Sequence, residues 1–280
     1  MNTEKLIQLY ETDKRSYGFS ENTILNYASD VRQFVLWYNN GDVTQVRKTE
    51  IKQYVRHLTE EYSPTTTNRK LMALKSFYSW LSDEMEICDN PTVGVKGVKT
   101  ENKTRSYIPI EEMEQIIKDI TDTRDLAIIL TMAIAGLRVG EIAASDRGDY
   151  QEDRLLVHGK GNKERVVAVS GKLKQSLDEY IREYNVQDGS LFISKSTRDR
   201  ITTNGVRYIV EQVSMSTGIK LHPHLFRHTA ATYAYEGTGD IVAVRDLLGH
   251  NSVATTTVYT HALPMFTKRA IESNPLNSLS

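Results

Sequence analysis

Gly136-Leu-Arg-Val-Gly-Glu141 and His224-Leu-Phe-Arg-His-Thr-Ala-Ala-Thr232 place charged and hydrogen-bonding side chains beside glycine or at the edge of an expected helix. Two further segments share this character, namely Gly159-Lys-Gly-Asn-Lys-Glu-Arg165 and Leu248-Gly-His-Asn-Ser-Val-Ala-Thr-Thr-Thr-Val-Tyr-Thr-His261. Arginine binds phosphate oxygens through paired hydrogen bonds, lysine and histidine move protons, and tyrosine can attack as a nucleophile. The four segments together therefore favour phosphoryl transfer.

The chain around these segments shows helical spacing of apolar residues, broken by one short apolar hairpin. Leu155–His158 and Arg165–Ser170 flank a glycine-bearing turn, which predicts two paired strands. We expect Gly136 to cap the helix before it. The expected helices of this part cover residues 110–120, 123–135, 138–144, 172–184, 203–214, 224–234, 241–248, 253–259 and 264–273.

Residues before about 92 read as helices only, with apolar residues three and four positions apart. The expected helices cover residues 3–14, 21–38, 49–59 and 64–81. Ser20 is placed to cap the second helix, and Ser63 with Pro64 is placed to begin the fourth. Asn90-Pro91 ends the last of these helices. We therefore expect a helical domain over residues 1–92, a linker over 93–106 and a second domain over 107–280, which makes the chain mainly α with a small β-sheet.

Composition limits the class of protein further. The chain has 280 residues, 39% of them hydrophobic, with a net charge of −1 and a single cysteine, Cys88. A helix over the longest apolar run, Leu126 to Leu137, would be about 18 Å long against a hydrocarbon core of about 30 Å. We expect a cytoplasmic protein that does not cross a membrane and has no secretory signal. Bulk charge gives no support to a nucleic-acid partner, so any such partner must be bound through local charge.

In this order, the four segments resemble the tyrosine recombinase (phage integrase) family, most closely its Xer-like members. The resemblance covers nearly everything from residue 107 to 262. It implies an N-terminal helical domain that binds core DNA and an α/β catalytic domain with a C-terminal helix that docks on a neighbouring subunit. It implies Glu141 as the acidic residue that braces the site. The catalytic residues that it implies are Arg138, Lys160, His224, Arg227, His250 and Tyr259.

The implied reaction requires neither a metal nor any other cofactor. Tyr259 would attack a DNA phosphate, forming a 3′-phosphotyrosyl link and a free 5′-hydroxyl, which attacks the link of a partner strand in turn. Arg138, Arg227 and His250 would stabilise the transition state, while Lys160 would protonate the leaving oxygen. His224 would assist Tyr259. The implied partners are double-stranded DNA and a homo- or heterotetramer on two DNA sites, with no membrane contact.

Several alternatives remain open on the sequence. A type IB topoisomerase-like enzyme shares the phosphotyrosine chemistry, and a DNA-binding accessory protein could use the fold without cleavage. Lys163 competes with Lys160 for the role of general acid. His222, His224 and His228 have a spacing that can bind zinc, but Arg227 among them would repel a cation. We therefore expect no metal site and leave His222 without a role.

Two expected helix starts offer side chains suited to the DNA backbone and major groove. The expected DNA contacts are Thr66, Asn68, Arg69, Lys70, Lys75, Thr203, Asn204 and Arg207.

Overall fold

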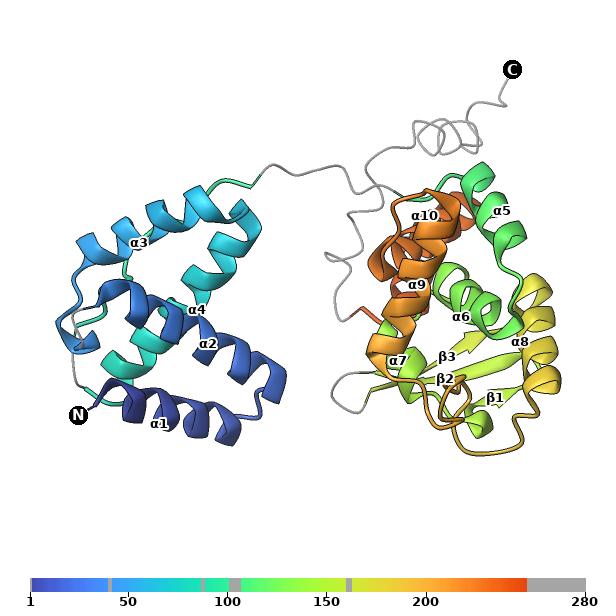
Figure 1. Cartoon of the computed structure of the whole chain (residues 1–280), viewed down its shortest axis with the longest axis horizontal. Helices are drawn as coiled ribbons and strands as arrows, with labels where there is room; N and C mark the ends of the chain where they lie inside the picture. Colours follow the sequence, from blue (N-terminus) through green and yellow to red (C-terminus); the bar gives the residue numbers. More distant parts are fainter. Residues whose placement is uncertain (1, 40–41, 87–88, 101–106, 160–162, 251–280) are drawn as a thin grey trace, which may run out of the picture. The chain divides into compact units, whose positions relative to one another are not determined.

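A computed structural model describes residues 2–39, 42–86, 89–100, 107–159 and 163–250. The chain divides into two compact units, Met1–Lys103 and Thr104–Ser280. The described part is mainly helical with a small sheet, as the sequence predicts (Figure 1). No helix in the described ranges is long and apolar enough to cross a membrane.

The first unit consists of helices packed around an aromatic core. Ser20 and Ser63 accept hydrogen bonds from backbone N–H groups in the first turns of α2 and α4, which confirms both predicted caps. Tyr10, Phe34 and Phe77 are fully buried in the core. The helices are α1 (Thr3–Ser16), α2 (Glu21–Tyr38), α3 (Lys48–Glu61) and α4 (Pro64–Asp83), with the 3-10 turn η1 (Val43–Gln45) before α3.

Part of the segment expected as a linker lies against this first unit. Val95 is buried in the aromatic core. The amide of Asn68 donates to the Val98 carbonyl and accepts from the Val98 N–H, both at 2.8 Å. Residues 95–98 therefore belong structurally to the first unit, although their sequence has no periodic apolar face that would predict it.

The second unit packs helices around α6, which is buried on nearly every side. Figure 1 shows α6 near the centre of this unit, with α8 on one side and α10 on the other. The Ile108 N–H donates to Thr229 on α10, which holds the start of the unit in place. The helices are α5 (Ile110–Asp119), α6 (Thr123–Ala133), α7 (Val139–Ala144), α8 (Gly171–Tyr184), α9 (Thr203–Thr217), α10 (Pro223–Thr238) and α11 (Ile241–Leu248).

The sheet that the described residues form has three antiparallel strands in the order β1–β2–β3. The predicted hairpin corresponds to β2 (Arg154–His158) and β3 (Glu164–Ala168), with Leu155 opposite Val167. The sequence did not predict β1 (Tyr150–Gln151), because two residues are too short to show alternation. The 3-10 turn η2 (Arg147–Asp149) leads into β1.

The structure corrects the expected cap at Gly136, and two expected helices lie on residues that it does not describe. Helix α6 ends at Ala133 with Ile134 as its C-cap, so Gly136, at φ +67°, lies in the turn beyond the cap. The helices expected over residues 253–259 and 264–273, including the subunit-docking helix, lie outside the described residues.

Candidate active site

Glu141 is the buried carboxylate at the centre of the candidate site. It lies on the first turn of α7, 5% exposed. The backbone N–H of Arg138, the N-cap residue, donates to Glu141 Oε2 at 2.8 Å, and Arg138 Nη1 donates to Oε1 at 2.7 Å. The carboxylate thus fixes both the start of α7 and the guanidinium of Arg138.

A second arginine on the same carboxylate was not given a role from the sequence. Arg165 on β3 donates from Nη1 and Nη2 to the two oxygens of Glu141, at 3.0 and 2.9 Å. The strand register places Arg165 opposite the buried Val157. Arg165, Val167 and Val169 stand at every second position and therefore share one face of the strand. This pattern could have predicted a partner for Arg165, because an arginine on a buried strand face requires an acidic group.

These contacts keep Glu141 ionised. Burial acts to raise the pKa of the Glu141 carboxyl, but the hydrogen bonds from Arg165 and from the backbone and side chain of Arg138 outweigh burial and lower the pKa below its usual range. A permanent negative charge at this position can hold several guanidinium groups together.

Arg227 is the third arginine near Glu141. It lies on α10, 5% exposed as a residue, with Nη1 at 3.9 Å from Glu141 Oε2. Nη1 also donates to the carbonyl of Gly136, and Nη2 donates to the carbonyl of Leu248 at 2.5 Å. By contrast, the side chain of Arg138 is 42% exposed. The structure therefore brings Arg138 and Arg227 together around one carboxylate, with Arg138 the more accessible of the two.

The histidines near Arg227 have distinct surroundings. His224 is exposed on the first turn of α10, and His228 is half-buried. His222 is the N-cap of α10, where Nδ1 accepts a hydrogen bond from the Leu225 N–H at 3.1 Å. Among the described residues, no group of three or more His, Cys, Asp or Glu side chains could hold a metal ion.

His250 follows α11 and is half-buried, with its backbone N–H donating to the Arg245 carbonyl at 3.1 Å. Lys160 and Tyr259, the expected general acid and nucleophile, lie outside the described residues. The candidate site in the described part of the chain therefore consists of Arg138, Glu141, Arg227 and His250, with His224 on the same helix as Arg227.

The hairpin that carries Lys160 in the sequence is closed by contacts on both sides of that residue. The Gly159 N–H donates to the Lys163 carbonyl at 2.6 Å. His158 lies between Asp149 and Glu164, with ring nitrogens 3.1 Å from each carboxylate. The hydrogen bond with Asp149, followed by the charges of both carboxylates, raises the pKa of His158. This exposed histidine therefore gains positive charge more readily than an isolated one.

The expected DNA contacts on α4 differ in accessibility. Lys70 is 3% exposed, and its ammonium is 3.1 Å from Asp30 Oδ1. The structure therefore corrects the expectation that Lys70 offers an exposed phosphate contact, because its side chain is buried and its ammonium is held by Asp30. Arg69 is exposed but also paired with Asp30, and Asn68 holds the backbone of Val98. Thr66 and Lys75 are half-buried.

The expected DNA contacts on α9 lie together at the start of the helix. Arg207 donates from Nη1 to Asn204 Oδ1 at 2.9 Å and to Thr203 Oγ1 at 3.4 Å. Asn204 and Arg207 are exposed, whereas Thr203 is half-buried. The three polar side chains thus form one surface group on the first turns of α9.

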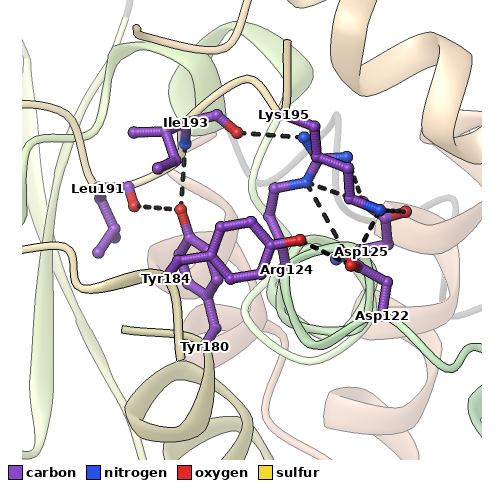
Figure 2. Close-up of polar contacts among 8 residues, drawn as sticks. All are labelled: Asp122, Arg124, Asp125, Tyr180, Tyr184, Leu191, Ile193 and Lys195. Atoms are coloured by element: carbon purple, nitrogen blue, oxygen red, sulfur yellow. Dashed lines mark hydrogen bonds and ion pairs between the residues drawn. The ribbon is translucent and has the colours of Figure 1, made fainter. Parts of the chain in front are cut away.

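A polar network holds the segment that leads into α9 (Figure 2). Arg124, at the start of α6, donates to the Ile193 carbonyl at 3.2 Å, and Tyr180 accepts from the Ile193 N–H at 3.1 Å. Lys195 pairs with Asp122 at 2.9 Å. These contacts attach the segment to α6 and α8. They therefore fix the path of the backbone before α9, which begins at Thr203.

Comparison with known proteins identifies relatives over both units. The profile described as "Phage integrase family" matches residues 106–265, and that described as "Phage integrase, N-terminal SAM-like domain" matches residues 6–86. Tyrosine recombinase XerC of Actinobacillus pleuropneumoniae is 34% identical over 69% of this chain and 66% of its own. The XerC of Pediococcus pentosaceus is 31% identical over 93% of each chain.

Solved structures show the same fold. The crystal structure of XerA recombinase is 28% identical, covers 96% of this chain and 97% of its own, and has a TM-score of 0.55. A lambda integrase tetramer bound to a Holliday junction is 17% identical, covers 90% of this chain and 78% of its own, and has a TM-score of 0.75.

Proposed function

The chain belongs to the phage integrase family, the tyrosine recombinases, and we propose that it exchanges DNA strands through a covalent link between Tyr259 and a 3′-phosphate. As an enzyme it is a site-specific DNA recombinase. The relatives reported above are recombinases, which favours this function over DNA relaxation and over a DNA-binding role without cleavage.

The contact of Arg138 and Arg227 with a single carboxylate is the observation that carries the proposal. Nη1 of Arg138 is 2.7 Å and Nη1 of Arg227 is 3.9 Å from the oxygens of Glu141. Two guanidinium groups held this close can neutralise two non-bridging oxygens of one phosphate, where charge accumulates in the transition state. Because Glu141 is charged, it offsets their mutual repulsion before DNA binds.

The remaining steps follow from the motif residues. Tyr259 attacks the phosphorus atom, and the bond to the 5′-oxygen breaks. Lys160 gives that oxygen a proton, and His250 donates a hydrogen bond to the phosphate. His224 assists removal of the tyrosine proton, since an unperturbed tyrosine pKa of about 10 leaves little phenolate at neutral pH. The 5′-hydroxyl of a partner strand then attacks the phosphotyrosyl bond, which releases Tyr259.

We propose double-stranded DNA and a tetramer of recombinase subunits on two sites as the assembly. The lambda integrase tetramer on a Holliday junction supports this arrangement for the fold. In the second unit, the exposed Asn204 and Arg207 at the start of α9 are suited to phosphate contact. Because the relatives are bacterial enzymes that act on DNA, we propose the cytoplasm as the place of action.

Covalent capture on DNA tests the proposal. The protein is incubated with fragmented host genomic DNA, denatured, and recovered with any attached strand, which is then sequenced. We expect adducts at one short sequence, joined through a 3′-phosphate. The Tyr259→Phe variant should bind the same sequence but form no adduct, because only the attacking oxygen is lost. Absence of adducts from the parent protein would support the accessory role, and relaxation without joining of two sites would support a topoisomerase.

A further inference from the structure

Arg165 joins three elements of the candidate site through one buried side chain. It extends from β3, is 12% exposed, and binds both oxygens of Glu141 on α7. Its Nε donates to the carbonyl of Leu247 on the last turn of α11, at 2.9 Å. Since His250 lies two residues after the last residue of α11, a single guanidinium connects the residue that holds Arg138 to the segment that carries His250.

The end of α11 is held by two arginines. The last carbonyls of a helix have no partner within the helix, and they carry the negative end of its dipole. The carbonyl of Leu247 accepts from Arg165, and the next carbonyl, of Leu248, accepts from Arg227. Both arginines also approach Glu141, so the contacts form a closed ring from Glu141 through each arginine to the end of α11.

The glycine after α11 fits this arrangement. A Cβ atom at Gly249 would lie 3.0 Å from Cδ and 3.1 Å from Nη1 of Arg165. Gly249 also has φ +63°, which an L side chain rarely adopts. The backbone therefore passes directly over the Arg165 side chain, immediately before His250.

We infer that Arg165 is a positioning residue for strand cleavage, which sets His250 relative to the phosphate by linking the end of α11 to Glu141. The inference rests on the proposed function. The fork of the guanidinium is essential to this role, since it supplies donors in three directions from a flat group. Lysine keeps the charge, but its three donors radiate from one nitrogen, whereas three separate nitrogens of Arg165 reach the two oxygens of Glu141 and the Leu247 carbonyl.

The test compares Arg165→Lys with Arg154→Lys on the same hairpin. Arg154 is exposed on β2 and donates to Gln151 at 3.1 and 2.8 Å. Each full-length variant is mixed in excess with a nicked duplex carrying the site mapped by covalent capture. Affinity, melting temperature and the single-turnover rate of adduct formation are measured. We expect Arg165→Lys to bind with parental affinity but to cleave about 10- to 100-fold more slowly, the scale of a small misplacement of reacting groups. Arg154→Lys should match the parent.

A double-mutant cycle with His250→Ala separates positioning from general stability. If Arg165 acts through the end of α11, its substitution should cost much less in a protein that already lacks the His250 side chain. An equal loss in both backgrounds, a parental cleavage rate for Arg165→Lys, or a rate that falls only in parallel with affinity would overturn the inference. If the parent forms no adduct, the proposed function fails and the inference fails with it. If the parent forms adducts and Arg165→Lys forms them equally fast, the inference alone fails.

Discussion

Arg227 on α10 donates a hydrogen bond of 2.5 Å from Nη2 to the backbone carbonyl of Leu248, at the end of α11. The same guanidinium donates through Nη1 to the carbonyl of Gly136, in the turn before α7. One buried side chain therefore fixes the backbone at two segments of the candidate site. The side chain of Arg138 is 42% exposed, and the contact described for it is with the Glu141 carboxylate rather than with backbone carbonyls of other segments.

This difference predicts distinct behaviour for the two arginines. Arg138→Ala and Arg227→Ala should each slow adduct formation by at least about 100-fold, by analogy with the loss of one preorganised transition-state donor. Arg227→Ala should also lower the melting temperature, because the Gly136 and Leu248 carbonyls lose a buried donor. Single-turnover kinetics and thermal unfolding measure the two effects. A loss of DNA affinity with no change in cleavage rate would make these residues simple phosphate contacts.

A second prediction concerns Glu141 and acid stability. Replacing Glu141 with Gln leaves Arg165 buried without its counter-charge, which should lower the free energy of unfolding by roughly 3–5 kcal/mol near pH 7. The folded pKa of Glu141 lies below its unfolded value of about 4.3, so the carboxylate stabilises the fold above that pH and loses this contribution as the pH falls through the folded pKa.

Urea unfolding followed by far-UV circular dichroism measures this effect over a series of pH values. The difference between the parent and Glu141→Gln should be constant near neutrality and shrink below about pH 4. Glu179→Gln, an exposed carboxylate on α8, serves as the control and should have little effect. If the parent and Glu141→Gln differed in free energy of unfolding by the same amount at about pH 7 and about pH 3, the prediction would be contradicted.

The sequence predicted most of this architecture because local signals determine it. Ser20 and Ser63 carry the side-chain oxygens that begin α2 and α4, and apolar spacing marks the helices between such caps. The polar motifs also predicted that Arg138, Glu141 and Arg227 belong to one site. In the structure, the guanidinium groups of Arg138 and Arg227 both lie within 4 Å of the Glu141 carboxylate.

Long-range pairing was beyond the reach of the sequence. Asp30 and Lys70 lie forty positions apart, and no local pattern distinguishes a lysine that turns inward from one that faces DNA. The partner of Arg165 is likewise on another element, so its strand alternation indicates burial but does not identify Glu141. The contact between Asn68 and Val98 follows from the path of the chain after α4, which composition does not determine.

The buried pair in the first unit gives a third prediction. Asp30→Asn should destabilise this unit by roughly 3–5 kcal/mol, because the Lys70 ammonium loses its charge partner. Trp37 and Trp80, the two tryptophans of the chain, both belong to this unit, so their fluorescence reports its unfolding. Glu60→Gln, an exposed carboxylate on α3, is the control.

The Lys70→Met variant tests whether Lys70, the partner of Asp30, contacts DNA. Since Lys70 is buried, its replacement should leave the salt dependence of DNA affinity unchanged, whereas loss of a phosphate contact would lower the slope by about 1. Titrations of site DNA at several salt concentrations measure the slope. If a folded Lys70→Met protein showed a reduced salt dependence of DNA affinity, Lys70 would be a DNA contact after all.

The fourth prediction concerns metal removal. The proposed roles assign charge neutralisation to Arg138 and Arg227 and proton transfer to Lys160. EDTA should therefore leave the rate of adduct formation unchanged when protein and DNA are both treated before mixing. Loss of cleavage that a divalent cation restores would overturn this mechanism, and the ion that restores it would identify the class of site.

The last prediction distinguishes Lys160 from Lys163 as the general acid. The 5′-oxygen is a poor leaving group as an alkoxide, so its departure depends on a proton donor. A sulfur atom in place of that bridging oxygen removes the requirement, because a thiolate leaves without a proton. The test therefore uses two nicked duplexes of identical sequence, one with the natural bridging oxygen and one with sulfur at the cleaved bond.

Lys160→Ala should be badly impaired on the oxygen duplex yet cleave the sulfur duplex nearly as fast as the parent, because the substitution supplies the leaving ability that the lysine no longer provides. Arg138→Ala should gain little from sulfur, since the charge on the non-bridging oxygens is unchanged. Lys163→Ala should behave like the parent on both duplexes. If sulfur instead rescues Lys163→Ala and leaves Lys160→Ala slow, the proton comes from Lys163, whose backbone carbonyl closes the hairpin against Gly159.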